Sequence, residues 1–165
     1  MHRGAVSDTI IPSGTFEPPW LIWARRYIGT VEIHGPTSEP LVEWFHAATT
    51  GGAAGDDVPW CSSFLCRAMQ DQGMDHPRSK SSQAWRNWGA GVGPILGAVA
   101  VLSYGAGRGH VGIVTGRTLA GGVVLLGGNQ GNAVSIKAFP TSRIIGYRWP
   151  RAPLVDDPGA AASTR

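Results

Sequence analysis

Two residues of this sequence have types and surroundings suited to nucleophilic chemistry, and the first is Cys61. It follows Pro59-Trp60 and opens the run CSSFLCRAMQDQG, whose apolar spacing predicts a helix. A thiol in the first turn of a helix lies beside unpaired backbone N–H groups, which should lower its pKa below the usual value of about 8.5. The alternative is that Cys61 is a small buried hydrophobic residue, as free cysteines commonly are.

The second cysteine, Cys66, is predicted to have no catalytic role. It lies five residues further on, about 500° around the helix from Cys61, in an apolar run where core packing is the default. Two cysteines are also too few for a multi-disulfide framework or an all-cysteine zinc site. Separate roles for the two thiols are therefore expected.

A cysteine nucleophile needs a base, and His110 is the best candidate among five histidines. The run RGHVGIV places it at the start of a predicted strand, between two glycines, where an imidazole can face a cleft from a rigid sheet. A strand-end histidine bonded only to its local surroundings is the alternative. The remaining histidines have no motif around them: His2, His34, His46 and His76.

The third group of such a site holds the imidazole in the correct tautomer. Asn129, in the turn GGNQGN after a Val/Leu strand, is predicted to accept the second imidazole N–H. The tolerance of asparagine and glycine for positive φ would also explain this turn without any catalytic role. The backbone N–H of Cys61 is the expected oxyanion donor, with Ser62 as a second candidate, and Trp60 and Trp85 are candidate cleft walls.

The elements that position these residues divide into two halves. The pattern predicts helices over about 19–28, 40–50 and 59–72, followed by a brief helix over 81–88. Short Val/Ile-rich segments bounded by glycine or proline then predict five antiparallel strands, at 97–105, 110–117, 121–128, 133–139 and 143–149. Helices followed by strands indicate an α+β domain in which the two halves meet in a cleft.

Length and composition limit the domain organisation and the possible partners. With 165 residues, 42% of them hydrophobic, the chain is long enough for one stable domain, predicted over 18–150 between a lead-in (1–17) and a flexible tail (151–165). The net charge of +3 favours anionic partners, but the basic residues form no block. No run suits a signal peptide or a membrane span, so synthesis in the cytoplasm without a leader is expected.

Four runs, in order along residues 18–150, make the chemistry more specific: PWCSSFLCRAMQDQG, SSQAWRNWG, GHVGIVTG and GGNQGNAVSIKAFPTSRIIGYRWP. Together they resemble the NlpC-like and CHAP-like cysteine peptidoglycan hydrolases. The resemblance implies a papain-like core with Cys61 as nucleophile, His110 as base and Asn129 as orienting residue. It also implies no metal or organic cofactor. The chain departs from the family at residues 94–98, where PILGA replaces a Pro-Gly-Asp run.

On this resemblance the expected activity is hydrolysis of amide bonds in the peptide part of bacterial peptidoglycan, through a covalent acyl-enzyme. The protein would act in the periplasm or cell wall, as a phage endolysin released by holins or as a secreted antibacterial effector with an immunity protein. No nucleic-acid partner is expected. Two alternatives remain open: a cysteine acyltransferase or deamidase acting on proteins, and a non-catalytic wall-binding module.

Overall fold

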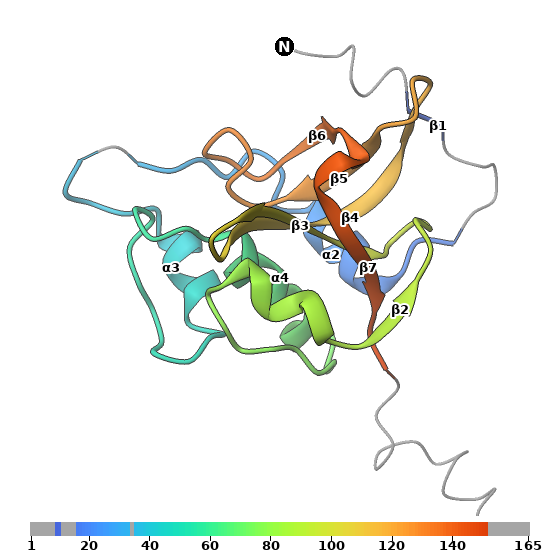
Figure 1. Cartoon of the computed structure of the whole chain (residues 1–165). Helices are drawn as coiled ribbons and strands as arrows, with labels where there is room; N and C mark the ends of the chain where they lie inside the picture. The colour runs from blue at the N-terminus through green and yellow to red at the C-terminus, as the bar shows by residue number, and fades with distance from the viewer. Residues whose placement is uncertain (1–8, 11–15, 34, 152–165) are drawn as a thin grey trace, which may run out of the picture.

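The computed structural model describes residues 9–10, 16–33 and 35–151 (Figure 1). Its helices are α2 (Pro19–Arg25), α3 (Pro40–His46), α4 (Cys61–Asp71) and the 3-10 helices η1 (Ser82–Asn87) and η2 (Thr141–Arg143). Its strands are β1 (Thr9–Ile10), β2 (Ala90–Val92), β3 (Val99–Gly105), β4 (Arg108–Thr118), β5 (Val123–Gly127), β6 (Ser135–Phe139) and β7 (Ile144–Trp149). The α-helices precede the main strands, which confirms the α+β class.

The strands form one antiparallel sheet in the order β2-β7-β3-β4-β5-β6, with β1 paired to β4. The five predicted strands correspond to β3–β7. The sequence did not indicate β2, because three residues that include a glycine are too short to show alternation. It did not indicate β1 either, which lies in the predicted lead-in. The rest of that lead-in, apart from residues 16–17, and the predicted tail beyond residue 151 lie outside the described residues.

A first core fills the space between the helices and one face of the sheet (Figure 1). Its centre is a cluster of aromatic rings from α2, α3 and α4, in which Trp23 packs 5.4 Å from Phe64 and Phe45 packs 5.1 Å from Phe64. The indole of Trp23 also donates to Asp71 at 2.9 Å and so connects α2 to the far end of α4. These contacts fix α2 and α3 against α4.

A second core lies on the opposite face of the sheet. Because side chains alternate along a strand, Val99 and Val101 face the helices while Ala100 and Leu102 face this second core. Phe139 of β6 and Ile144, Tyr147 and Trp149 of β7 pack onto it. Strands of the sheet itself therefore cover this face. Burial on both faces explains why β3 is a continuous apolar run rather than an alternating one.

The start of α4 is held by a buried histidine of α3. His46 Nδ1 lies 2.6 Å from the Ser63 hydroxyl and its Nε2 lies 3.3 Å from the Val58 carbonyl, so one imidazole joins α3, α4 and the loop before α4. Both His46 and Ser63 are fully buried. His46 is therefore a structural link, which agrees with the prediction that it is not the base.

Candidate active site

A cavity of about 290 Å³ opens where the start of α4, the start of β4, the β5–β6 turn and β6 meet. It brings together the three residues that the sequence singled out, although they are widely separated in the chain. The residues that line it are Pro59, Cys61, Tyr104, Gly109, His110, Asn129, Gln130, Gly131, Lys137 and Phe139.

The imidazole of His110 is held by Gln130 rather than by Asn129. His110 Nε2 lies 2.9 Å from Gln130 Oε1. The amide nitrogen of Gln130 donates to the carbonyls of Leu125 at 3.0 Å and Ser135 at 2.8 Å, which fixes which end of the amide faces the imidazole. Because Oε1 is an acceptor, Nε2 must carry the proton, and the neutral imidazole keeps its lone pair on Nδ1. His110 is thus set to accept a proton at Nδ1.

Two glycines make room for this arrangement. A Cβ at Gly127 would lie 2.5 Å from Gln130 Oε1, and a Cβ at Gly112 would lie 3.3 Å from the same oxygen. Asn129 takes the turn position instead, with φ of +57°. The sequence prediction chose the wrong amide of the Asn129-Gln130 pair, since both amides suit the chemistry and only the fold determines which one reaches the imidazole.

The environment of His110 keeps it neutral. Its ring stacks on Phe139 with centroids 5.3 Å apart, and only 8% of the residue is exposed. Burial lowers the pKa of His110, the hydrogen bond that it donates to Gln130 partly raises this pKa, and the charge of Lys137 lowers it again. A neutral imidazole at neutral pH is the form that can act as a base.

Cys61 lies in the first turn of α4, as the sequence predicted, although the helix begins at Cys61 itself rather than at Pro59, and 6% of Cys61 is exposed. Burial raises the pKa of its thiol to about 11, although the backbone N–H groups of Val111, Ser62 and Cys61 itself favour the thiolate. The predicted lowering of this pKa is therefore wrong in direction. Within the described residues the thiol makes no hydrogen bond to His110. The thiol form of Cys61 therefore predominates at neutral pH.

Three other predicted site residues lie in the core and not at the cavity. The Ser62 hydroxyl accepts from the Trp85 indole at 2.8 Å and donates to the Ser79 carbonyl at 2.6 Å, so it cannot meet an oxyanion. The Trp60 indole donates to Glu32 at 2.8 Å. Trp60 and Trp85 are fully buried, and the cavity walls are formed instead by smaller aromatic residues and a proline. Cys66 is also fully buried, as expected for a core residue.

The cavity is electrostatically positive. Of the described residues that line it, Lys137 alone carries a charge, and its ammonium lies 5.8 Å from the ring centroid of Phe139. The guanidinium of Arg143 lies 5.9 Å from the ring centroid of Tyr104, which lines the same cavity. An anionic group would be favoured next to Cys61 and His110.

In the described ranges, no three His, Cys, Asp or Glu side chains come together in a way that could hold a metal ion. No helix in those ranges is long and apolar enough to cross a membrane. No family model and no curated protein sequence matches this chain.

Proposed function

We propose that this protein is a cysteine hydrolase that cleaves amide bonds in the peptide part of peptidoglycan, with Cys61 as nucleophile and His110 as base. The observation that carries the proposal is the hydrogen bond from His110 to Gln130, which leaves a lone pair on Nδ1 of a neutral imidazole, in a residue that lines the same cavity as Cys61. The family resemblance of the sequence supports a papain-like core and the peptidoglycan substrate.

The reaction follows from the resting protonation states. As the sulfur of Cys61 attacks the amide carbonyl carbon, its proton passes to Nδ1 of His110, because a thiol of such high pKa does not supply a preformed thiolate. The oxyanion is met by backbone N–H groups at the start of α4. His110 then gives the proton to the leaving amine. In the second step it takes a proton from water, which releases the acid and the thiol.

The positive cavity supports a substrate with a carboxylate near the scissile amide. The peptides of peptidoglycan carry such carboxylates, and Lys137 is the group able to bind one. Salt should weaken this contact, since Lys137 is exposed.

The decisive experiment is digestion of purified peptidoglycan followed by mass spectrometry of the fragments. Each cut should create one new amine and one new carboxylic acid, with the carboxyl oxygen taken from ¹⁸O-labelled water. Release of ammonia without chain cleavage would assign a deamidase instead. Transfer of the acyl group to an added amine in place of water would assign an acyltransferase.

Replacing Gln130 with alanine should lower kcat by about 10²-fold, because the imidazole loses the partner that fixes its tautomer. The same bond raises the pKa of His110, so its loss should move the acidic limb of the activity profile to lower pH. Steady-state rates measured across pH test both effects.

Asn129→Gly is the matched variant for this comparison. It removes the neighbouring amide but preserves the positive φ of the turn, at which glycine carries no strain. We expect a much smaller loss of kcat and no movement of the acidic limb. Equal effects of the two substitutions would mean that Gln130 does not orient the base.

Replacing Lys137 with glutamine should lower kcat/KM by about five- to ten-fold for peptides with a carboxylate next to the scissile amide. For peptides in which that carboxylate is amidated, kcat/KM should fall little in the variant. Because the charge of Lys137 lowers the pKa of His110, the acidic limb should also move to higher pH. The same loss of kcat/KM for acid and amide peptides would contradict the assigned contact.

A further inference from the structure

A second cavity, of about 220 Å³, lies beside β7 and shares no lining residue with the first. Its lining is Arg86, Asn87, Val101, Ile145, Gly146 and Arg148. In β7, Gly146 pairs with Val101 but Ile144 pairs with Leu102, so Ile145 is an extra residue in a bulge. This bulge interrupts the pairing of β3 with β7 at the second cavity, which we call the hollow.

The guanidinium of Arg148 is held in place at one side. Its Nε donates to the Trp88 carbonyl at 2.6 Å and its Nη2 donates to the Gly89 carbonyl at 3.0 Å. Within the described part of the chain, Nη1 has no hydrogen-bond or ion-pair partner. A guanidinium that is held in place and still has unpaired N–H donors is preorganised to bind an anion.

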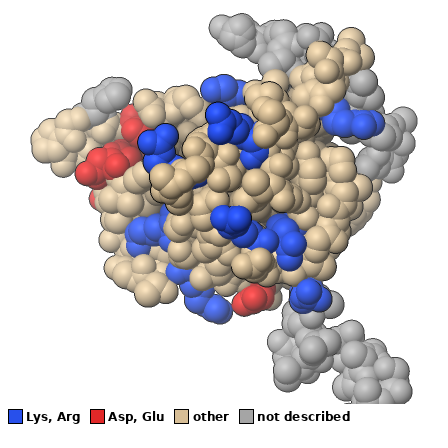
Figure 2. All heavy atoms as spheres, in the orientation of Figure 1, with Lys and Arg blue, Asp and Glu red and all other residues tan. Residues whose placement is uncertain are grey.

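The second positive group is Arg86, at the end of η1. Its guanidinium makes no hydrogen bond or ion pair with any described residue, and it borders the same hollow as Arg148. No carboxylate lines the hollow. Figure 2 shows Lys and Arg side chains gathered over β7 on this face, whereas the acidic side chains in that view lie at its margins. Two like charges placed together favour an anion between them.

We propose that this hollow is a phosphate-binding site, able to take a phosphoryl group as the free ion or as an ester. A phosphoryl group offers oxygens in several directions, so the forks of Arg86 and Arg148 and the amide of Asn87 can each bind one. The volume exceeds that of one phosphate, which leaves room for an attached ester group. The site does not depend on the chemistry proposed for Cys61.

The test is titration of the full-length protein with inorganic phosphate, followed by calorimetry and by NMR of the Arg148 Nε–H signal. Saturable binding that shifts this signal is expected. Arg86→Gln should weaken binding about ten-fold or more, since a charge-assisted contact is lost from an exposed side chain that the fold does not need.

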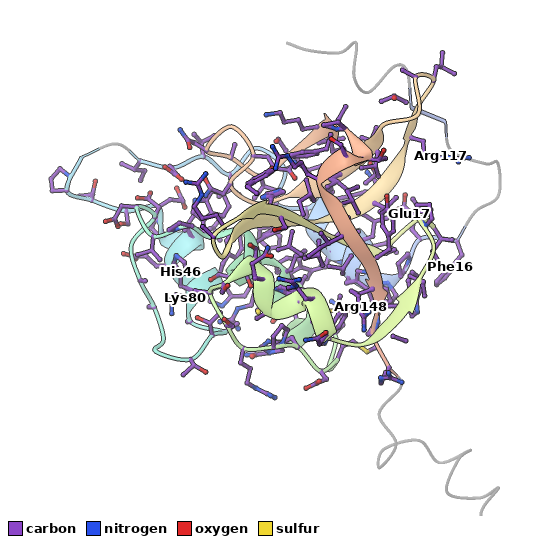
Figure 3. The ribbon with its side chains drawn as sticks, viewed as in Figure 1. Phe16, Glu17, His46, Lys80, Arg117 and Arg148 are labelled. Atoms are coloured by element: carbon purple, nitrogen blue, oxygen red, sulfur yellow. The ribbon has the colours of Figure 1, made fainter. Side chains whose placement is uncertain are left out.

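The matched control is Arg117→Gln, which removes the same charge from β4. Figure 3 shows Arg117 well away from Arg148. We expect a loss of about two-fold or less for this variant. The proposal would be overturned by an absence of saturation, by equal losses in the two variants, or by acetate binding as tightly as phosphate.

Two further titrants identify the source of the phosphoryl group. Glycerol phosphate represents a small ester, and poly(glycerol phosphate) represents an anionic polymer. Tighter binding of the polymer at equal phosphate concentration would support the site and assign it to polymer binding. Equal affinity per phosphate would support the site and assign it to small phosphates.

Discussion

Replacing Cys61 with alanine should abolish cleavage of peptidoglycan, with kcat lower by about 10⁴-fold or more, because no second thiol and no Ser or Thr hydroxyl is among the described residues that line the cavity. The fold should be retained, since the change removes one sulfur at the edge of the cavity and leaves the start of α4 bonded through Ser63. The measurement is the release of new amino groups from purified peptidoglycan, with circular dichroism to check the fold.

Cys66→Ala is the control, because Cys66 lies on the same helix but is fully buried away from the cavity. It should keep most of the activity and lose some stability from the missing core contacts. Activity in the Cys61 variant comparable with that of the Cys66 variant would rule out Cys61 as the nucleophile.

Replacing His110 with alanine should lower kcat by about 10³-fold or more, because the thiol then has no base to receive its proton. In the wild type, activity should rise as pH increases through the pKa of His110, which burial lowers from its usual value, and then stay level. In the variant, the residual activity should instead keep rising toward the thiol pKa of about 11. The measurement is kcat/KM as a function of pH.

Added imidazole provides the control for this variant. It should restore part of the activity near neutral pH, because the missing ring leaves a space in a cavity of about 290 Å³. The Cys61 variant should gain nothing from imidazole. A His110 variant with the wild-type pH profile would show that another group accepts the proton.

The positions of Cys61 and His110 were predictable because they depend on local sequence. A proline and an apolar run mark the start of α4, and a short Val/Ile-rich run bounded by glycine marks β4. The choice between Asn129 and Gln130 was not predictable. It depends on the turn conformation and on carbonyl acceptors of Leu125 and Ser135, which only the folded sheet brings to the Gln130 amide.

The direction of the Cys61 pKa shift also needed the structure. A helix N-terminus stabilises a charge by up to about 2 kcal/mol. Full burial can shift a pKa by about 3–5 units, and each unit corresponds to about 1.4 kcal/mol. The helix start is a local feature that the sequence reveals, but the burial of the thiol arises from packing between distant elements. The larger of the two effects was therefore the one that the sequence does not show.

The position of β7 has a consequence for the order of assembly. β7 is the last strand of the described residues to be synthesised, yet it lies inside the sheet, hydrogen-bonded to β2 on one side and to β3 on the other. Until residues 144–149 have left the ribosome, β2 lacks its partner strand and one edge of β3 is unpaired. Completing the sheet therefore requires contacts between residues that are far apart in the sequence, and such contacts form slowly. A chain that ended before β7 would contain Cys61 and His110 but would lack the complete sheet that positions them.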